Sequence, residues 1–288
     1  MGKLDGKVTI VTGCARGIGK GIALLLGSEG AKVVCADRDL KEGDHPFFEG
    51  SAETTASEIQ AAGGTAVSVY VDTSREEDCA NLVAKAREAF GPIDVLVNNA
   101  AYTFYLPVID YPIRKWFRSC SVNLHGYFMM AQMVLSDMIE RKNGAIVNIS
   151  SGDAIGPGRG PYKEAATGNT MYGAEKAAIE RFTQGLAQEV YPYGISVTAL
   201  SPAIGVQTPG STYFREQRIA AGLIDPKSPW EREPVEYMAK ATLLLATEPL
   251  DKITGRVTYS QAILKEFSWI KEGKGTGVDR PGSGFSKI

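Results

Sequence analysis

Short apolar runs alternate along the chain with longer segments of helical periodicity. The apolar runs are rich in β-branched residues and cover residues 8–12, 32–36, 66–71, 94–98, 145–150, 195–200 and, more briefly, 256–259. The helical segments cover residues 17–30, 52–62, 76–90, 116–140, 170–191 and 234–246. Most apolar runs are continuous rather than alternating, which is typical of parallel strands covered by helices on both faces. The pattern predicts an α/β fold with a doubly wound parallel sheet in a single domain.

A glycine-rich turn connects the first predicted strand to the first predicted helix. Its glycines have the spacing G-x-x-x-G-x-G. Glycines in such a turn let the backbone approach a pyrophosphate, and the helix N-terminus stabilises the negative charge. We therefore predict cofactor contacts at Gly13, Arg16, Gly17, Ile18 and Gly19. The alternative is a tight turn without a ligand, but the strand before it, the helix after it and an acid downstream favour a nucleotide site.

That acid is Asp37, which ends the second predicted strand at the position where a carboxylate meets the adenosine ribose. A carboxylate there accepts hydrogen bonds from both ribose hydroxyls and repels a 2′-phosphate. Arg38 and Arg16 act in the opposite direction, because guanidinium groups bind phosphate well. Asp37 weighs more because it occupies the ribose position itself. The sequence therefore predicts NAD as cofactor, with NADP as the alternative.

Tyr172 and Lys176 stand four residues apart in a predicted helix and so share one of its faces. A tyrosine has a pKa of about 10 and exchanges protons poorly near neutrality unless its environment lowers that pKa. We expect the charge of Lys176, with that of a nicotinamide ring, to favour the phenolate. Ser151 follows a predicted strand and offers a hydroxyl that could stabilise charge on a substrate oxygen. Alone, the Tyr/Lys pair could also be two exposed helix residues.

These motifs, in this order, resemble those of the short-chain dehydrogenase/reductase family in its compact single-domain form, over residues 6–255. The glycine turn matches the family's T-G-x-x-x-G-x-G loop, and residues 98–101, Asn-Asn-Ala-Ala, are similar to its N-N-A-G segment. The resemblance implies four catalytic residues, Asn123, Ser151, Tyr172 and Lys176, with Ser150 as the second choice of serine. It also implies cofactor contacts at Asp72, Thr73, Asn99, Ala100, Ala101, Tyr172, Lys176, Pro202 and Thr208.

The resemblance also implies a role for each catalytic residue. Tyr172 exchanges a proton with the substrate oxygen, Lys176 lowers the pKa of Tyr172 and binds ribose hydroxyls, and Asn123 holds a water that links Lys176 to solvent. The chain departs from the family pattern at Thr208, one position later than the family's nicotinamide-contacting threonine. The connection from Ser151 to Tyr172 is also longer than the family usually has.

The implied function is that of an NAD(H)-dependent alcohol dehydrogenase or ketoreductase, which interconverts a secondary alcohol and a ketone with Tyr172 as acid and base. Three alternatives are an NADP-dependent ketoacyl-type reductase, a non-catalytic dinucleotide-binding sensor or structural protein, and a sugar-nucleotide epimerase or dehydratase. The serine, tyrosine, lysine and asparagine together favour an enzyme, because binding alone does not need Ser151. The segment after Lys176 leaves room for a lid but not for a second domain, which disfavours the epimerase.

We divide the chain into a catalytic domain, residues 1–271, and a Gly-rich tail, residues 272–288, that is mobile or packs on a neighbouring subunit. A substrate lid is expected at about residues 209–233. Aromatic residues there and after two strands predict an apolar pocket for a bulky or cyclic hydrophobic alcohol, with ordinary loop packing as the alternative. Within it we expect substrate contacts from Ile155, Tyr162 and Phe104. An insertion at residues 43–50 either lies over the adenosine or is a surface loop.

Composition adds few constraints on partners. The net charge of −2 and the pI near 5.9 give no reason to expect nucleic acid. No apolar run approaches the roughly 18 residues of a membrane span, and scattered cysteines without C-x-x-C spacing indicate a reducing, cytoplasmic setting. His45 and His125 have no neighbouring metal ligands in the sequence, so no metal site is expected. The family resemblance implies assembly into dimers or tetramers through helices 116–140 and 170–191. Both helices carry apolar residues on more than one face. We therefore expect a homotetramer, with a homodimer second.

Overall fold

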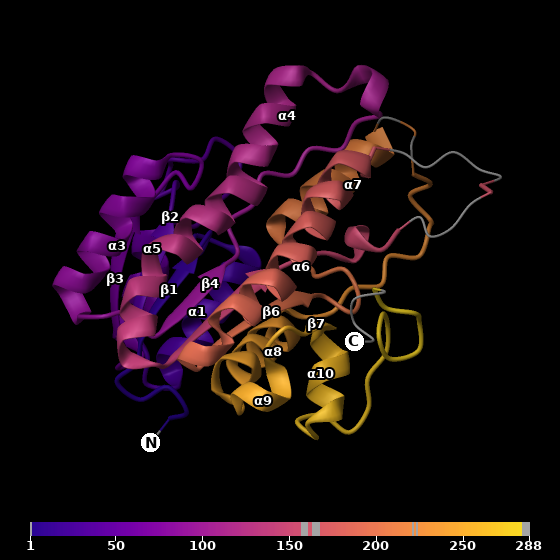
Figure 1. Cartoon of the computed structure of the whole chain (residues 1–288). Helices are drawn as coiled ribbons and strands as arrows, with labels where there is room; N and C mark the ends of the chain where they lie inside the picture. Colours follow the sequence, from indigo (N-terminus) through magenta and orange to yellow (C-terminus); the bar gives the residue numbers. More distant parts are fainter. Residues whose placement is uncertain (1, 157–160, 163–167, 221, 223, 284–288) are drawn as a thin grey trace.

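The computed structural model describes residues 2–156, 161–162, 168–220, 222 and 224–283. In this part of the chain, one parallel sheet of seven strands has the order β3-β2-β1-β4-β5-β6-β7 (Figure 1). The strands are β1 (Val8–Thr12), β2 (Lys32–Asp37), β3 (Thr65–Tyr70), β4 (Val95–Asn98), β5 (Gly144–Ile149), β6 (Ile195–Ser201) and β7 (Val257–Tyr259). The predicted doubly wound sheet is confirmed, and each strand end lies within one residue of its predicted position.

Helices cover both faces of the sheet because successive strand residues point to opposite sides. Val33 and Cys35 of β2 pack into one apolar cluster, and Val34 and Ala36 pack into the other. The first cluster includes residues of α1 (Gly17–Ser28), α2 (Ala52–Ala61), α8 (Val235–Thr247) and α10 (Ser260–Glu266). The second includes residues of α3 (Glu76–Phe90), α5 (Gly126–Arg141) and α6 (Thr170–Val190). With both faces covered, the carboxyl ends of the strands remain as the place for a ligand.

The segment predicted as one helix over residues 116–140 is divided into three parts. α4 (Ile113–Cys120) runs into a π-helical turn, η2 (Ser121–His125), and α5 follows it. Such turns often occur at functional sites, and this one contains the buried Asn123. A local change of helical register leaves the spacing of apolar residues nearly intact, so the sequence pattern did not predict the turn.

Several short helices were not predicted from the sequence. The longest of them, α7 (Pro209–Ala220), forms the first half of the expected lid. The others are α10 and the shorter η1 (Val108–Asp110), η3 (Gly152–Ala154), η4 (Tyr191–Tyr193) and α9 (Leu250–Ile253). No helix in the described residues is long and apolar enough to cross a membrane.

The described part of the C-terminal tail packs against its own chain. The backbone N–H of Thr276 donates to the carbonyl of Ala203 at 2.8 Å. Farther along, the backbone N–H of Ser283 donates to the Tyr259 hydroxyl at 2.7 Å, and Ser283 is buried. Gly275, with a φ of 95°, gives the tail the left-handed turn it needs to fold back. These intrachain contacts differ from the mobile or intersubunit tail expected from the sequence.

Candidate active site

A cavity of about 660 Å³ lies at the carboxyl ends of the strands, within the size range of small-molecule sites, roughly 300–1,000 Å³. It brings together nearly all of the predicted site residues, from loops far apart in the sequence. The predicted residues on its lining are Gly13, Arg16, Gly17, Ile18, Gly19, Asp37, Arg38, Asp72, Thr73, Asn99, Ala100, Ala101, Phe104, Ser151, Tyr172, Lys176, Pro202 and Thr208. Three predicted residues, Asn123, Ile155 and Tyr162, are not among its lining residues.

The glycine turn between β1 and α1 brings backbone close to the cavity. Gly13 has a φ of 70°, and a Cβ on it would lie 2.7 Å from the Ala100 Cα. A Cβ on Gly19 would lie 2.1 Å from the Gly13 carbonyl oxygen, so neither position tolerates a side chain. α1 has no side-chain cap and no acidic residue in its first turn. Its N-terminus therefore suits a pyrophosphate, whose charge the helix dipole stabilises.

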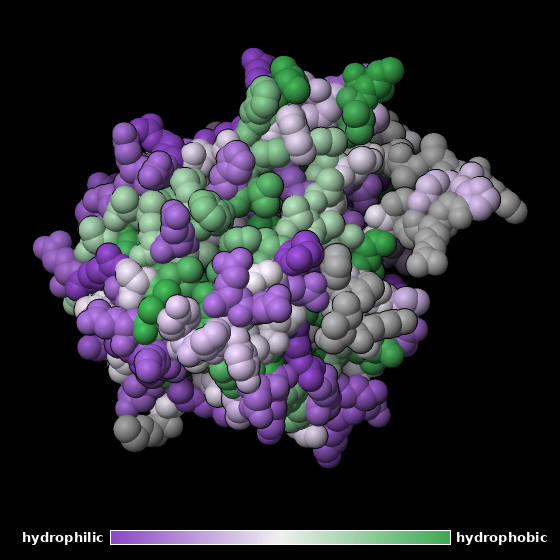
Figure 2. All heavy atoms as spheres, viewed as in Figure 1, coloured by the Kyte–Doolittle hydropathy of each residue, from purple (hydrophilic) through white to green (hydrophobic). Residues whose placement is uncertain are grey.

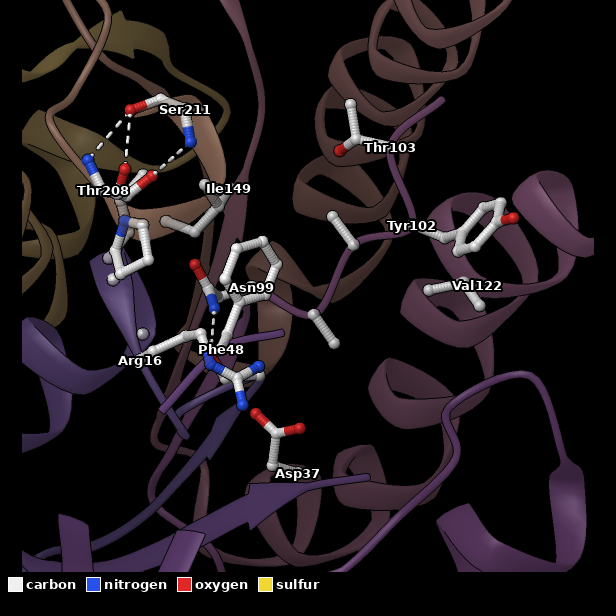
Figure 3. Close-up of a pocket in the computed structure, with 18 of the residues that line it drawn as sticks. Arg16, Asp37, Phe48, Asn99, Tyr102, Thr103, Val122, Ile149, Thr208 and Ser211 are labelled. Atoms are coloured by element: carbon white, nitrogen blue, oxygen red, sulfur yellow. Dashed lines mark hydrogen bonds between the residues drawn. The ribbon is translucent and has the colours of Figure 1, made fainter. Parts of the chain in front are cut away.

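At the end of β2, Asp37 lies on the cavity wall (Figure 3). Its carboxylate accepts hydrogen bonds from the backbone N–H of Ala15 at 2.8 Å and of Asp39 at 3.0 Å. Burial raises the pKa of Asp37, and these two hydrogen bonds act in the opposite direction. They fix the carboxylate at the rim, in the position predicted for the adenosine ribose.

Arg16 is paired with an acid that the sequence analysis did not single out. Its guanidinium donates to Asp39 at 2.7 Å and to the Gly50 carbonyl at 2.9 Å. Asp39 is buried and the Arg16 side chain is 20% exposed, so this ion pair is partly shielded from solvent. The only sequence signal for Asp39 was its place two residues after Asp37. The pairing reduces the ability of Arg16 to act as a phosphate ligand.

Asp72, predicted to contact the adenine, lies on the cavity wall and is bound by neighbouring side chains. One carboxylate oxygen accepts from Arg118 of α4 at 2.8 Å, and the other accepts from the Ser74 hydroxyl at 2.7 Å. Burial by itself raises the pKa of Asp72, but the hydrogen bonds from Arg118 and Ser74 outweigh it and lower the pKa. Asp72 is therefore held as an ionised acceptor at the adenine end.

At the opposite end of the cavity, Tyr172 and Lys176 project from α6. The Lys176 ammonium lies 5.6 Å from the centroid of the Tyr172 ring. Burial lowers the pKa of Lys176 to about 7. Burial also raises the pKa of Tyr172, an effect increased by Tyr105, and a hydrogen bond with Thr103 only partly opposes it. The expected lowering of the Tyr172 pKa is therefore not produced by the protein groups, because burial disfavours the charge of both partners.

Lys176 makes hydrogen bonds that the sequence analysis did not predict. Its Nζ donates to the Ile149 carbonyl at 2.7 Å and to the Tyr127 hydroxyl at 3.0 Å. Tyr127 Oη in turn donates to the same Ile149 carbonyl at 3.0 Å. The only sequence signal for Tyr127 was its place four residues beyond Asn123.

Asn123 lies behind the cavity wall. Its amide nitrogen donates to the Tyr102 carbonyl at 2.8 Å and to Glu175 Oε2 at 2.7 Å, and its oxygen accepts from the Tyr102 backbone N–H at 2.8 Å. These bonds join the π-turn to the loop after β4 and to α6. The Asn123 side chain thus positions the loop that carries Tyr102, and the water relay expected from the resemblance remains a prediction.

The two candidate serines after β5 differ in their partners. Ser150 is 3% exposed, and its hydroxyl donates to Glu180 at 2.9 Å. Ser151 is less buried, and its Oγ accepts from the backbone N–H of Asp153 at 3.2 Å. The Ser151 hydroxyl proton remains available for a substrate oxygen, whereas Ser150 is engaged with a buried carboxylate. The geometry favours Ser151 as the catalytic serine.

A row of aromatic rings connects the 43–50 insertion to the lid and to Tyr172. Phe48 contacts Tyr213 of α7 at a ring distance of 5.5 Å, and Tyr213 contacts Phe214 at 5.7 Å. Tyr105 then contacts both Phe214, at 5.5 Å, and Tyr172, at 6.0 Å. All five rings line the cavity, and Phe48 is drawn there beside Arg16 and Asn99 (Figure 3). The insertion therefore lies over the cofactor end of the cavity.

The substrate contacts predicted at Ile155 and Tyr162 gain no support from the cavity and stay predictions. Neither residue lines the cavity, and Tyr162 is 60% exposed. Ile155 directly follows the short helix η3. The rest of the connection, residues 157–160 and 163–167, lies outside the described residues. The cavity wall is formed instead by Phe104 and Tyr105, after β4, and by residues of α7.

Thr208 lies at the start of α7 and faces the glycine turn. A Cβ on Gly17 would lie 3.3 Å from the Thr208 methyl group. Thr208 Oγ1 accepts from the backbone N–H of Ser211 at 3.1 Å, and the Ser211 hydroxyl accepts from the Thr208 N–H at 2.9 Å (Figure 3). This reciprocal pair caps the helix and holds the lid against the cofactor end of the cavity.

The His45 side chain is engaged within the 43–50 insertion. His45 Nδ1 accepts from the backbone N–H groups of Phe47 at 3.1 Å and Phe48 at 3.2 Å, so it shapes the insertion. Within the described ranges, no three His, Cys, Asp or Glu side chains form a group that could hold a metal ion.

Comparison with known proteins identifies the family. The family model for short chain dehydrogenase matches residues 7–219. An uncharacterized oxidoreductase of Staphylococcus aureus (strain MRSA252) is 30% identical over 249 residues, which cover 86% of this chain and 94% of the relative. Hydroxysteroid dehydrogenase-like protein 2 of Danio rerio is 31% identical over 265 residues, 92% of this chain but 59% of the relative. The crystal structure of gox2181 is similar with a TM-score of 0.75 at 27% identity, covering 89% of this chain and 95% of that chain. The chain therefore belongs to the short-chain dehydrogenase family of oxidoreductases.

Proposed function

We propose that the protein is an NAD(H)-dependent oxidoreductase that interconverts a secondary alcohol and a ketone, with Tyr172 as the acid and base. One observation carries the proposal: Ser151, Tyr172 and Lys176 line the same cavity as the glycine turn of α1. A protein that only binds a dinucleotide does not need a free serine hydroxyl and a Tyr/Lys pair at the far end of the site. Their convergence supports catalysis over sensing.

The chemistry follows from the positions of these side chains. The Ser151 hydroxyl donates a hydrogen bond to the substrate oxygen and stabilises charge that develops on it. Tyr172 takes the hydroxyl proton in oxidation and returns it in reduction. NAD(H), when bound, supplies the hydride acceptor or donor and a nicotinamide charge that favours the Tyr172 phenolate. Lys176 holds its ammonium beside Tyr172 and within reach of the cavity.

The acidic end of the cavity supports NAD over NADP. The Asp37 carboxylate is fixed at the rim by two backbone N–H groups. A 2′-phosphate beside it would meet a negative charge, and the nearby Arg16 is paired with Asp39. Arg38 is half exposed, at 50%, and lies 3.8 Å from the same Asp39. The local charge therefore favours a ribose with free hydroxyls.

The aromatic wall supports a bulky or cyclic hydrophobic substrate. Phe104, Tyr105 and Phe214 line the cavity, and the Tyr105 ring contacts both Phe214 and Tyr172. Flat apolar rings suit the faces of a fused-ring or aromatic carbinol better than a short aliphatic alcohol. The Danio rerio relative has hydroxysteroid dehydrogenase-like in its name, and a steroid belongs to this chemical class.

NADH absorbance tests the proposal directly. The purified protein would be incubated with NAD or NADP and a panel of secondary alcohols from small aliphatic to fused-ring compounds. We expect NADH formation to be fastest with NAD and the bulky alcohols. Tyr172→Phe serves as the control for catalysis by contaminating enzymes. Tight NADH binding by the unmodified protein, with no turnover of any alcohol or the matching ketones, would favour the dinucleotide-binding sensor.

A further inference from the structure

The Lys176 ammonium contacts a second tyrosine besides Tyr172. Tyr127 comes from α5, and its ring lies 4.8 Å from the Lys176 Nζ. Lys176 is 1% exposed and Tyr127 is 2% exposed, so water does not compete for the hydrogen bond between them. The two side chains and the Ile149 carbonyl form a closed set of three mutual hydrogen bonds.

The geometry determines the direction of each proton. Tyr127 has a single hydroxyl proton, which it donates to the Ile149 carbonyl. Its oxygen is therefore an acceptor toward Lys176. An ammonium has three N–H donors, and the Tyr127 hydroxyl and the Ile149 carbonyl take two of them. The third donor is left for the cavity, where Tyr172 lies.

We propose that Tyr127 is a positioning residue that holds Lys176 in its charged form and directs the remaining N–H toward Tyr172 and the cofactor. The inference rests on the proposed function only for its effect on turnover. An acceptor fixed on a buried ammonium favours the charged form, which burial alone disfavours. Burial raises the pKa of Tyr127 itself, so this hydroxyl stays neutral and does not replace Tyr172 as the acid.

Loss of the Tyr127 hydroxyl should act on two pKa values in sequence. Without the acceptor, the pKa of Lys176 falls further below its usual range. With less positive charge beside it, the pKa of Tyr172 rises, so the phenolate forms only at higher pH. The other groups that bear on the pair are unchanged by this substitution: Glu175 and Glu180 around Lys176, and Tyr105 and Asp153 around Tyr172.

Tyr127→Phe removes one oxygen and keeps the ring, and Tyr259→Phe is the matched control. Tyr259 is also buried, 1% exposed, and its hydroxyl is also bound, but to the Ser283 N–H and not to Lys176. Both variants lose one buried hydroxyl, so a purely structural role predicts similar effects from both. Similar melting temperatures would show that the two are comparable.

The first readout is independent of turnover. Lysine labelled with ¹³C at Cε gives the pKa of Lys176 by NMR titration, with its signal assigned by its absence in Lys176→Met. We expect a drop of about one pKa unit in Tyr127→Phe and no change in Tyr259→Phe. An equal pKa of Lys176 in all three proteins would overturn the proposal. If Tyr127→Phe does not fold, the unmodified protein with ¹³Cζ-labelled tyrosine tests the same contact, because the Tyr127 signal must move as Lys176 titrates.

The second readout is the pH dependence of alcohol oxidation. In Tyr127→Phe we expect kcat/KM at neutral pH to fall about tenfold and its rising limb to move to higher pH, while Tyr259→Phe keeps the original profile. A shifted Lys176 pKa with an unchanged pH profile would overturn the link to Tyr172. A protein that shows the Lys176 shift but turns over no alcohol would contradict the proposed function and leave the positioning role supported.

Discussion

The guanidinium of Arg16 lies 2.7 Å from the carboxylate of Asp39, at the cofactor end of the cavity. Arg16 is therefore neutralised by an acid of its own chain. Next to this pair, Asp37 presents its carboxylate to the cavity. Arg38 also lies near this group, 3.8 Å from Asp39. We propose that Asp39, by pairing with Arg16, influences cofactor choice together with Asp37.

We expect the unmodified protein to have a higher kcat/KM with NAD than with NADP. Asp39→Asn should release Arg16 and raise kcat/KM with NADP about tenfold, because a freed guanidinium can pair with phosphate. The double variant Asp39→Asn/Arg16→Ala should lose that gain. Steady-state rates with NAD and with NADP give kcat/KM for the unmodified protein and both variants. Equal efficiency with NAD and NADP in the unmodified protein would count against this explanation.

The serine pair offers a matched comparison. Ser151→Ala should lower kcat about a hundredfold with little change in stability, because it removes a donor to the substrate oxygen. Ser150→Ala should have a much smaller effect on kcat and should lower the free energy of unfolding by about 1–3 kcal/mol, because the buried Glu180 loses a partner. Urea unfolding and initial rates separate the two effects. A large loss of kcat in Ser150→Ala, with only a small one in Ser151→Ala, would identify Ser150 as the catalytic serine.

The aromatic wall predicts which residues select the substrate. Tyr105→Ala and Phe214→Ala should lower kcat/KM for fused-ring alcohols about tenfold more than for small alcohols, because only the large substrates contact these rings. Tyr162→Ala is the control, since Tyr162 is 60% exposed and does not line the cavity. Relative efficiencies across the panel are the measurement. If Tyr162→Ala, and not Tyr105→Ala, changed the preference for fused-ring over small alcohols, the substrate contact predicted at Tyr162 would be supported instead.

Several apolar side chains face solvent on the side formed by α4, α5 and α6 (Figure 2). Phe117 is 63% exposed and Phe128 is 50% exposed. Since apolar surface of this kind usually marks an interface, we expect a homotetramer, with a homodimer as the second choice. Light scattering should give the mass of four chains, and Phe128→Arg should reduce it. A monomeric mass for the unmodified protein at micromolar concentration would contradict the prediction.

Features that depend on local pattern could be predicted from the sequence. The continuous apolar runs predicted both ends of each strand to within one residue, because the sheet is buried on both faces. The glycine turn and Asp37 could be placed because each directly follows a strand, and parallel strands bring their carboxyl ends to one edge. Ser151 could be placed by the same rule, whereas Tyr172 and Lys176 were assigned from their spacing on one helix and from the family resemblance.

Features that depend on the distance between helices could not be predicted. Tyr127 contacts Lys176 because α5 and α6 pack at a particular distance, which periodicity does not determine. The hydrogen bond from Arg16 to the Gly50 carbonyl depends on the insertion folding back toward the glycine turn. The connection after Ser151 has no repeating sequence pattern, so periodicity could not determine its path or the substrate contacts assigned to Ile155 and Tyr162.

The proton transfer assigned to Tyr172 is tested most directly by Tyr172→Phe. NADH binding, followed by fluorescence, should stay within about twofold of that of the unmodified protein, because the ring and the cofactor contacts remain. NADH formation from NAD and a bulky secondary alcohol should fall by about 10³, in line with the loss of a general base. Near-normal turnover in this variant, with binding intact, would contradict the account.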